Sequence, residues 1–251
     1  MNAITASSWP YPRWIAHRGA GKLAPENTLA AFRLGAQYGY RMFECDAKLS
    51  ADGVPFLLHD ATLERTTNGR GTGGDLPLGA LAQLDAGSWH SRAYAGEAVP
   101  TLEALARFCI ANGYFLNIEI KPTPGQEETT GRVVGETAAR LWQGQAVPPL
   151  FSSFKPDALA GAQATAAHIP RALLLDTLWD GCLDTARRLD CVAIVCNHAL
   201  WDAALVAQVK GMGMRTLSYT VNDDWAAQRL IALGTDGIIT DRVDLFSPAT
   251  P

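Results

Sequence analysis

Residues 102–121, LEALARFCIANGYFLNIEIK, join a helical pattern to a strand pattern without a break. In the first half, apolar side chains recur at spacings of three and four, at Leu102, Leu105, Ala106, Cys109 and Ile110. This period predicts a helix with one apolar stripe. From residue 114 the pattern changes to alternation and stops at Pro122, which predicts a strand. A helix followed directly by a strand indicates an α/β protein.

The same succession of strand and helix patterns runs through the whole chain. Strands are predicted at residues 13–17, 42–49, 114–121, 150–154, 171–175, 191–196, 215–221 and 237–240. Eight such units in a chain of 251 residues match the size of one (β/α)8 TIM barrel. We therefore predict that residues 1–251 form a single barrel domain, with an open doubly wound sheet as the alternative.

One segment departs from this repeat. The turn at residues 50–53 (SADG) separates strand 42–49 from an apolar run at 54–59. A connection this short joins only antiparallel strands, so the second run is predicted to be a hairpin arm. The Gly- and Thr-rich stretch 60–100 that follows has little periodicity. We predict that it is a small insertion over the barrel mouth, since loops on that face carry function.

Composition and charge argue against several classes of partner. The formal net charge is −4, so the chain has no basic surplus for a nucleic acid or for stable association with an anionic membrane. No apolar run approaches the roughly 20 residues that span a bilayer, and residues 1–10 lack the pattern of a signal peptide. The five cysteines form no Cys-x-x-Cys pair and indicate free thiols in a reducing compartment. We expect a cytoplasmic protein of undetermined oligomeric state.

Glu44 and Asp46 stand two residues apart on strand 42–49, so their side chains project from one face. Two carboxylates held this close repel each other unless a cation or a shared proton compensates. Hard divalent cations prefer oxygen ligands of this kind. Alone, the pair is as typical of solvated acids at a strand end, so the metal-site hypothesis depends on the motifs that follow.

His59 ends the hairpin arm. If Leu49 and Val54 flank the turn, strand pairing places His59 opposite Glu44, within about one residue, and on the same face. The sequence therefore predicts an imidazole beside the acid pair. A lone histidine at a strand end is more often a structural residue, and the register of the hairpin is what favours the functional interpretation.

A third carboxylate comes from strand 114–121. Asn117, Glu119 and Lys121 share one face of this strand, directly before Pro122. In a barrel, the C-terminal end of a strand is the active face. The alternative is an ordinary Glu/Lys pair on the rim, which contributes roughly 0 to 1 kcal/mol.

The first strand ends in His17-Arg18-Gly19, which places an imidazole and a guanidinium beside a permissive glycine. Arginine binds phosphate oxygens in a bidentate manner, so Arg18 is a candidate phosphate ligand. Asn27 and Thr28 precede the next helical stripe and either can cap it. We predict that Asn27 is a helix cap in preference to a ligand.

Seven short motifs follow one another in the chain: His17-Arg18-Gly19, Ala24-Pro25-Glu26-Asn27-Thr28, Glu44-Cys45-Asp46, Asp52-Gly53 with His59-Asp60, Glu119-Ile120-Lys121, Tyr219-Thr220-Val221-Asn222 and Asp236-Gly237-Ile238-Ile239-Thr240-Asp241. In this order they resemble the signature of glycerophosphodiester phosphodiesterases. Each motif is common alone, whereas the full series spans nearly the whole chain and is specific. The resemblance implies a (β/α)8 barrel of the phospholipase-C-like kind.

The resemblance also implies a site and a reaction. It assigns Glu44, Asp46 and Glu119 to one divalent cation, His17 and His59 to acid-base catalysis, and Arg18, Lys121 and Tyr219 to the substrate. The cation would be Mg²⁺ or Ca²⁺, with Mn²⁺ also suitable. Tyr219 stands where many relatives have Trp, in the aromatic wall beside the glycerol moiety. The substrate would be a small glycerophosphodiester, hydrolysed to sn-glycerol 3-phosphate and an alcohol.

Two alternatives are open. A related barrel phosphodiesterase that acts on lysophospholipids or phosphoinositides would have an apolar or basic lip at its mouth. Residues 76–89 could supply one, although Asp75 and Asp85 weaken the case. A catalytically silent binding module on the same fold would lack a histidine or a metal carboxylate, and all of these residues are present.

Overall fold

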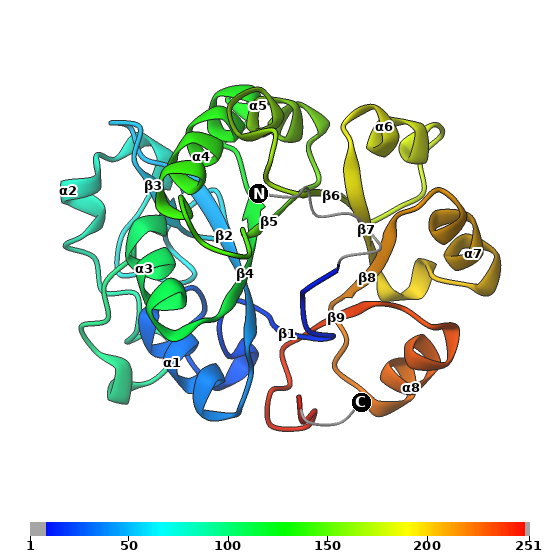
Figure 1. Cartoon of the computed structure of the whole chain (residues 1–251). Helices are drawn as coiled ribbons and strands as arrows, with labels where there is room; N and C mark the ends of the chain where they lie inside the picture. Colours follow the sequence, from blue (N-terminus) through cyan, green and yellow to red (C-terminus); the bar gives the residue numbers. More distant parts are fainter. Residues whose placement is uncertain (1–8, 249–251) are drawn as a thin grey trace.

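A computed structural model describes residues 9–248, in which a ring of strands lies inside a ring of helices (Figure 1). The strands are β1 (Trp14–Ala16), β2 (Met42–Leu49), β3 (Pro55–Leu57), β4 (Phe115–Ile120), β5 (Leu150–Ser153), β6 (Arg171–Leu175), β7 (Cys191–Asn197), β8 (Arg215–Tyr219) and β9 (Gly237–Thr240). The helices are α1 (Leu29–Gln37), α2 (Leu78–Leu81), α3 (Leu102–Asn112), α4 (Glu127–Leu141), α5 (Pro156–Ala166), α6 (Cys182–Arg188), α7 (Ala203–Gly211) and α8 (Asp224–Leu233). The prediction that the first ten residues are no signal peptide falls mostly on residues 1–8, outside the described range.

Within the described residues, eight parallel strands close into a barrel. They pair in the order β1-β9-β8-β7-β6-β5-β4-β2, and β1 pairs with β2 to complete the ring. Ala16 lies opposite Thr240 on one side and Phe43 on the other. This closure confirms the (β/α)8 prediction and excludes the open doubly wound sheet. The predicted strand ends differ from the observed ones by at most two residues.

Local sequence explains where the helices begin and end. The side-chain oxygens of Thr28 and Thr101 each accept a hydrogen bond from the backbone N–H three residues further on, which starts α1 and α3. Gly113, at a φ of 67°, ends α3 in the left-handed conformation that favours glycine. The predicted apolar stripe of α3 is buried at Leu102, Leu105, Ala106 and Cys109.

The barrel interior has an apolar part and a polar part. Because side chains alternate along a strand, residues two apart point to the same side. An interior cluster is formed by Ile15, Met42, Leu150, Ala172, Leu174, Ala193, Val195, Leu217 and Ile239. Further along the same faces, toward the C-terminal strand ends, come His17, Glu44, Asp46, Asn117 and Glu119. The polar side chains therefore gather at the end of the barrel where functional sites lie.

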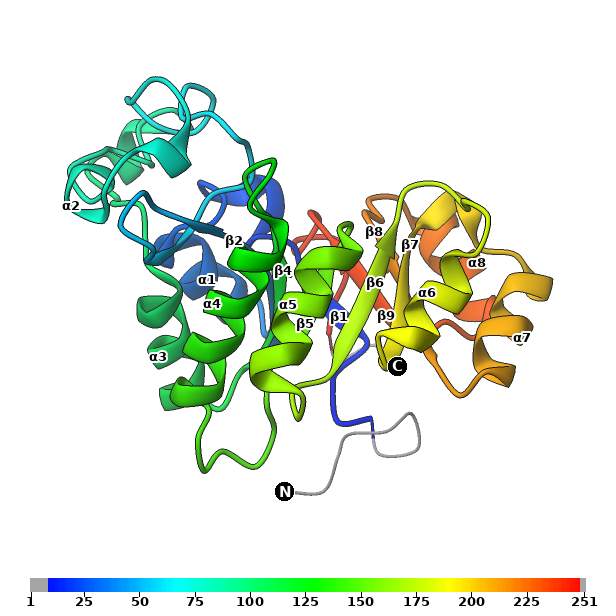
Figure 2. The same cartoon turned by 90° about the horizontal axis from the view of Figure 1, so that it is seen from above.

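β2 and β3 form the predicted antiparallel hairpin, with Lys48 opposite Phe56. Residues 60–100 then rise beyond the barrel beside β2, as the segment that carries α2 shows in Figure 2. This insertion has a small core of its own, made of Phe56, Leu58, Leu63, Leu81, Ala86 and Val99. Of residues 76–89, Trp89 is exposed, while Leu76, Leu78 and Leu84 are partly buried against this small core.

Two further predictions concern cysteines and the membrane. All five cysteines are buried and free of disulfide bonds, as the sequence predicts. Among the helices of residues 9–248, none combines the length and the apolar character that crossing a membrane requires.

Candidate active site

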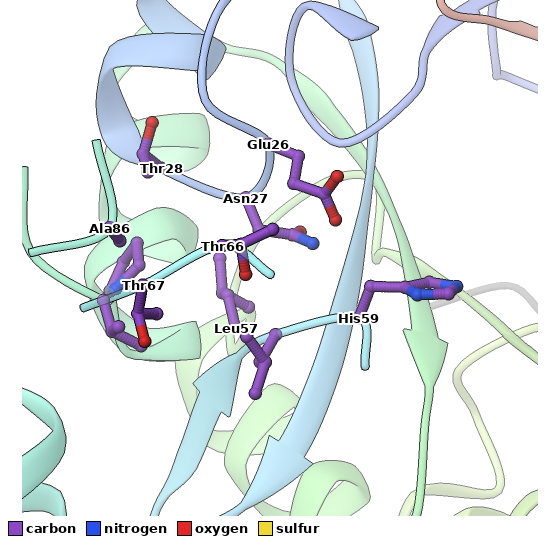
Figure 3. A pocket seen from close by; sticks show the side chains of 11 residues that line it. Glu26, Asn27, Thr28, Leu57, His59, Thr66, Thr67 and Ala86 are labelled. Carbon is purple, nitrogen blue, oxygen red and sulfur yellow. The ribbon is translucent and has the colours of Figure 1, made fainter. Parts of the chain in front are cut away.

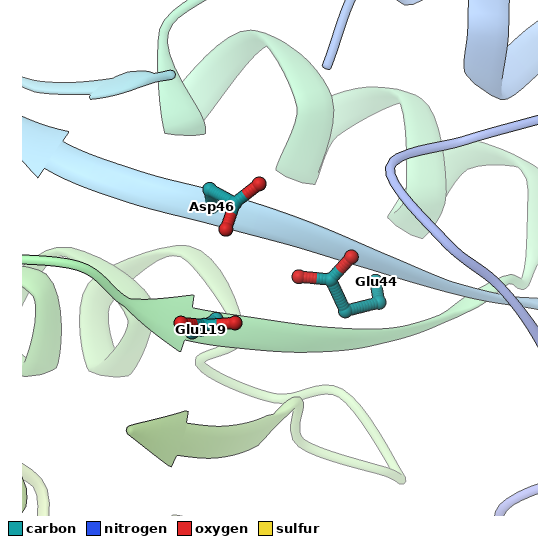
Figure 4. A group of neighbouring side chains, drawn as sticks. All are labelled: Glu44, Asp46 and Glu119. Carbon is teal, nitrogen blue, oxygen red and sulfur yellow. The ribbon is translucent and has the colours of Figure 1, made fainter. Parts of the chain in front are cut away.

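Three carboxylates from β2 and β4 converge on one face of these paired strands (Figure 4). Glu44 and Asp46 project from β2 and Glu119 from β4, and strand pairing sets Asp46 opposite Glu119. One oxygen from each carboxylate lies within 4.8 Å of the other two, and all three residues are buried. The structure thus brings together the three acids that we predicted would hold a cation.

The electrostatics of this acid cluster fit a cation. Burial, together with the charge of Asp46, raises the pKa of both Glu44 and Glu119. Glu44 Oε1 and Asp46 Oδ1 are buried and accept no hydrogen bond from any residue between 9 and 248. Three carboxylate donors suit a hard divalent cation. The residues present therefore meet the chemical requirements of the predicted metal.

Arg18 and Lys121 flank the acid cluster. Arg18 Nε lies 3.2 Å from Asp46 Oδ2, and the Arg18 backbone N–H donates to Glu44 Oε2 at 3.0 Å. Lys121 Nζ lies 2.8 Å from Glu119 Oε1 and 3.7 Å from Asp46 Oδ1. Burial alone would raise the pKa of Asp46, but the charges of Arg18 and Lys121 outweigh burial and lower it. Arg18 and Lys121 therefore both lie beside the acid cluster, and their binding of phosphate stays a prediction.

Asn27 holds Asp46 in place. Its Nδ2 donates to Asp46 Oδ2 at 2.8 Å, and its Oδ1 accepts from the Asp46 backbone N–H at 3.1 Å. Asn27 is buried and has a φ of 59°, a left-handed conformation that asparagine adopts more readily than most residues. The prediction that Asn27 caps α1 is wrong, because its amide reaches β2 and Thr28 is the N-cap.

His17 is anchored by a carboxylate that follows the last strand. Its Nδ1 lies 2.6 Å from Asp241 Oδ1, and its Nε2 lies 3.8 Å from Glu44 Oε2. Asp241 accepts from Asn222 Nδ2 at 2.9 Å, and its backbone N–H donates to Asn222 Oδ1 at 2.9 Å. Burial lowers the pKa of His17, but the bond to Asp241 and the charge of Glu44 outweigh burial and raise it. Because Nδ1 is engaged, Nε2 faces the acid cluster.

The hairpin register differs by one residue from the predicted one. Ala47 lies opposite Leu57, so continued alternation would place His59 opposite Cys45, on the outer face. β3 ends at Leu57, however, and the chain leaves the pleat before it reaches His59. His59 therefore lies beside the acid cluster because the strand stops, and the reason given by the predicted register is wrong.

His59 lies on the insertion side of the site. It lines a cleft together with Glu119 and Lys121. Its Nδ1 lies 2.6 Å from Asp60 Oδ1. Burial lowers the pKa of His59, and the negative charge of Asp46 offsets only part of that effect. Both predicted imidazoles thus lie near the acid cluster, each bonded to a carboxylate through Nδ1.

This cleft has a volume of about 370 Å³, and its lining includes one aromatic ring. Phe154 lines it, and Tyr219 meets the Phe154 ring edge-on with centroids 5.6 Å apart. Tyr219 Oη donates to Leu175 O at 3.0 Å, which fixes the phenol. Lys121 Nζ lies 5.5 Å from the centre of the Phe154 ring. Tyr219 therefore packs behind Phe154 and does not itself line the cleft, so its role in an aromatic wall for the substrate stays a prediction.

Sequence reasoning missed Lys48, Phe154, Asn222 and Asp241. Lys48 is the third residue on the face that carries Glu44 and Asp46, and alternation could have identified it. Its Nζ donates to Lys121 O at 3.2 Å, and burial lowers its pKa to about 8. Asn222 and Asp241 belong to motifs of the resemblance but have no role assigned from the sequence. Their link to His17 forms only when the barrel closes, since Asp241 bonds His17 and Asn222 bonds Asp241.

Buried acids that suit a metal, with an arginine and a lysine that suit phosphate, are typical of a barrel hydrolase of phosphate esters. Comparison with known proteins specifies the family. Residues 17–245 match the model of the glycerophosphoryl diester phosphodiesterase family, so the chain belongs to this family. This confirms the predicted family and places the chain among enzymes that hydrolyse phosphoric diesters.

Individual relatives cover almost the full chain. YhdW of Bacillus subtilis strain 168 is 34% identical over 240 residues, which cover 92% of this chain and 95% of YhdW. The glycerophosphodiester phosphodiesterase of Caldanaerobacter subterraneus subsp. tengcongensis is 33% identical over 233 residues, 90% of this chain and 93% of its own. An Oleispira antarctica phosphodiesterase, solved in complex with the product sn-glycerol-3-phosphate, superposes with a TM-score of 0.87 at 36% identity, covering 95% of this chain and 96% of its own.

Proposed function

We propose that the chain hydrolyses small glycerophosphodiesters to sn-glycerol 3-phosphate and an alcohol, in a reaction that depends on one divalent cation. The observation that carries the proposal is the convergence of Glu44, Asp46 and Glu119 with two imidazoles at one barrel mouth. The product complex of the Oleispira antarctica relative supports the identity of the phosphate product.

The acid cluster would hold the cation through Glu44, Asp46 and Glu119. Bound there, Mg²⁺, Ca²⁺ or Mn²⁺ would supply positive charge for the phosphate and the glycerol hydroxyls. Arg18 and Lys121 neutralise charge on the non-bridging phosphate oxygens. Because Asn27 fixes Asp46 through two hydrogen bonds, these groups are organised before the substrate arrives.

His17 and His59 divide the proton transfers. One imidazole takes the proton of the attacking oxygen as that oxygen bonds to phosphorus, and the other gives a proton to the alcohol oxygen as its bond to phosphorus breaks. Ionised Asp241 and Asp60 can only accept hydrogen bonds, so each keeps its histidine protonated at Nδ1. The Nε2 atom of each imidazole is then available to the substrate. Each proton transfer contributes about 10² to 10⁴ in rate.

The attacking oxygen is either water or the 2-hydroxyl of the substrate's own glycerol. The second route passes through a cyclic phosphate, which water then opens. In a single-turnover reaction followed by ³¹P NMR, a cyclic phosphate signal that precedes the product would identify the second route, because the first never forms a cyclic phosphate.

The proposal is tested by hydrolysis of glycerophosphocholine, with choline and sn-glycerol 3-phosphate both quantified. Activity should disappear in EDTA and return on addition of Mg²⁺, Ca²⁺ or Mn²⁺, and Glu119→Gln should need far more metal for the same rate. Full activity in chelator would remove the cation from the mechanism. A higher kcat/KM on lysophosphatidylcholine than on glycerophosphocholine would replace the small substrate by a lipid.

A further inference from the structure

Arg65 lies in the insertion and has no part in the mechanism above. Its guanidinium donates four hydrogen bonds to two carboxylates. Glu26 accepts at 2.7 and 2.8 Å, and Asp60 accepts at 2.6 and 3.0 Å. All four carboxylate oxygens are used. A single planar guanidinium therefore joins the loop after β1 to the end of the hairpin arm.

Each of these two carboxylates also contacts a residue of the site. Glu26 Oε1 accepts from Arg18 Nη1 at 2.8 Å, and Asp60 Oδ1 bonds His59 Nδ1 at 2.6 Å. Arg65 thus stands between the phosphate-binding arginine and one of the two imidazoles. Figure 3 shows Glu26 and His59 around one small pocket between the loop after β1 and the insertion, with Thr66 of the insertion beside them.

The insertion core fixes the backbone on both sides of Arg65. Leu63 is fully buried, and Thr66 and Thr67 are nearly so. Thr67 Oγ1 and the Thr67 backbone N–H both donate to Leu63 O, at 2.7 and 3.0 Å. The Arg65 side chain itself is 44% exposed, yet it starts from an anchored turn. The guanidinium is therefore held where it can orient its two acceptors.

We propose that Arg65 is a positioning residue for the reaction, which orients His59 through Asp60 and Arg18 through Glu26. The inference rests on the proposed function, because it assumes that His59 transfers a proton and that Arg18 binds the phosphate. A purely structural arginine–carboxylate ion pair lacks this connection to the site. Arg107 is such a case, since it bonds Glu103 at 2.6 and 3.1 Å on the surface of α3.

Loss of the guanidinium should affect both turnover and substrate binding. In Arg65→Ala, kcat for glycerophosphocholine should fall by up to about tenfold, no more than in Asp60→Asn, because Asp60 loses the support with which it holds His59, and KM should rise because Arg18 loses its orientation. Arg65→Lys should keep only part of kcat, since an ammonium cannot fork between two carboxylates. Millimolar guanidinium should restore part of the turnover of Arg65→Ala.

The two arms of the network can be separated. Asp60→Asn should lower kcat with little change in KM, and Glu26→Gln should mainly raise KM. Adding Arg65→Ala to Asp60→Asn should lower kcat less than it does in the wild-type chain, because the same contact is already lost. If Arg65→Ala lowered kcat by the same factor in both backgrounds, Arg65 would not act on His59 through Asp60.

Arg107→Ala is the matched control, and its kcat, KM and response to guanidinium should equal those of the wild-type protein. Thermal melts of all variants distinguish a loss of folding from a displacement of His59 or Arg18 in a folded protein. Wild-type kcat and KM in Arg65→Ala would overturn the inference, as would a loss that neither lysine nor guanidinium restores in any measure. His59→Ala is measured in parallel. If its turnover is near that of the wild-type protein, the proposed function is refuted. If His59→Ala is inactive while Arg65→Ala is normal, only this inference is refuted.

Discussion

The two imidazoles bond a carboxylate through Nδ1 at the same distance, 2.6 Å, but different regions of the molecule support them. On the barrel side, Asp241 holds His17 and is itself clamped by the neutral amide of Asn222. On the insertion side, the charged and partly exposed Arg65 holds Asp60. Closure of the barrel therefore positions His17, and the packing of the insertion against the barrel positions His59.

The barrel side uses the same clamp twice. Asn27 with Asp46 and Asn222 with Asp241 are both 19 residues apart, and each pair makes a side-chain bond and a backbone bond in the same sense. Salt screens the exposed ion pairs of Arg65 more than these less exposed amide bonds. We therefore expect the positions of the acid cluster and His17 to depend on the barrel, and the position of His59 to depend on the insertion.

The largest expected effect comes from removing either imidazole. His17→Ala and His59→Ala should each lower kcat for glycerophosphocholine by at least about 10²-fold, since each removes one proton transfer. Steady-state kinetics measures the loss, and circular dichroism checks the fold. Exposed His168 gives the control His168→Ala, which should match the wild-type protein. A near-wild-type rate for either site variant would discard its acid-base role.

The carboxylates behind the imidazoles should differ in effect. Asp241→Asn should lower kcat by about 10²-fold, because the partly buried His17 loses the acceptor that fixes its tautomer. Asp60→Asn should cost only about tenfold, since water can reach the more exposed His59 and take over part of the contact. Both are read from kcat under saturating substrate. The reverse order would contradict the assignment of the rigid anchor to the barrel.

Core substitutions give the smallest effect on turnover and test the independence of the insertion. Leu217→Ala, inside the barrel, should lower the free energy of unfolding by about 2 to 5 kcal/mol. Leu63→Ala, in the insertion core, should change the main thermal transition less, while limited proteolysis of residues 60–100 speeds up and kcat falls several-fold. If both variants shift the main transition equally, the insertion unfolds with the barrel and the comparison fails.

Alternation along strands was enough to predict the barrel, the hairpin and the shared face of Glu44 and Asp46. The position of Glu119 followed from the rule that C-terminal strand ends form the active face. The anchors were beyond this reasoning: Asp241 meets His17 only when β9 closes on β1, and Arg65 meets Glu26 only when the insertion is seated. The one-residue register shift is a further limit, because alternation within the hairpin does not predict that β3 ends at Leu57, whose neighbours Phe56 and Leu58 pack in the insertion core.

The central claim, that both imidazoles serve opposite proton transfers in one site, is tested most directly by changing the leaving group. Glycerol 3-(p-nitrophenyl phosphate) releases an anion that needs no proton, so the general acid becomes dispensable. His17→Ala and His59→Ala are compared on this ester and on glycerophosphocholine. One variant should recover to within about tenfold of the wild-type rate on the nitrophenyl ester, while the other stays impaired on both substrates. Equal impairment of both variants on both esters would contradict the division of roles.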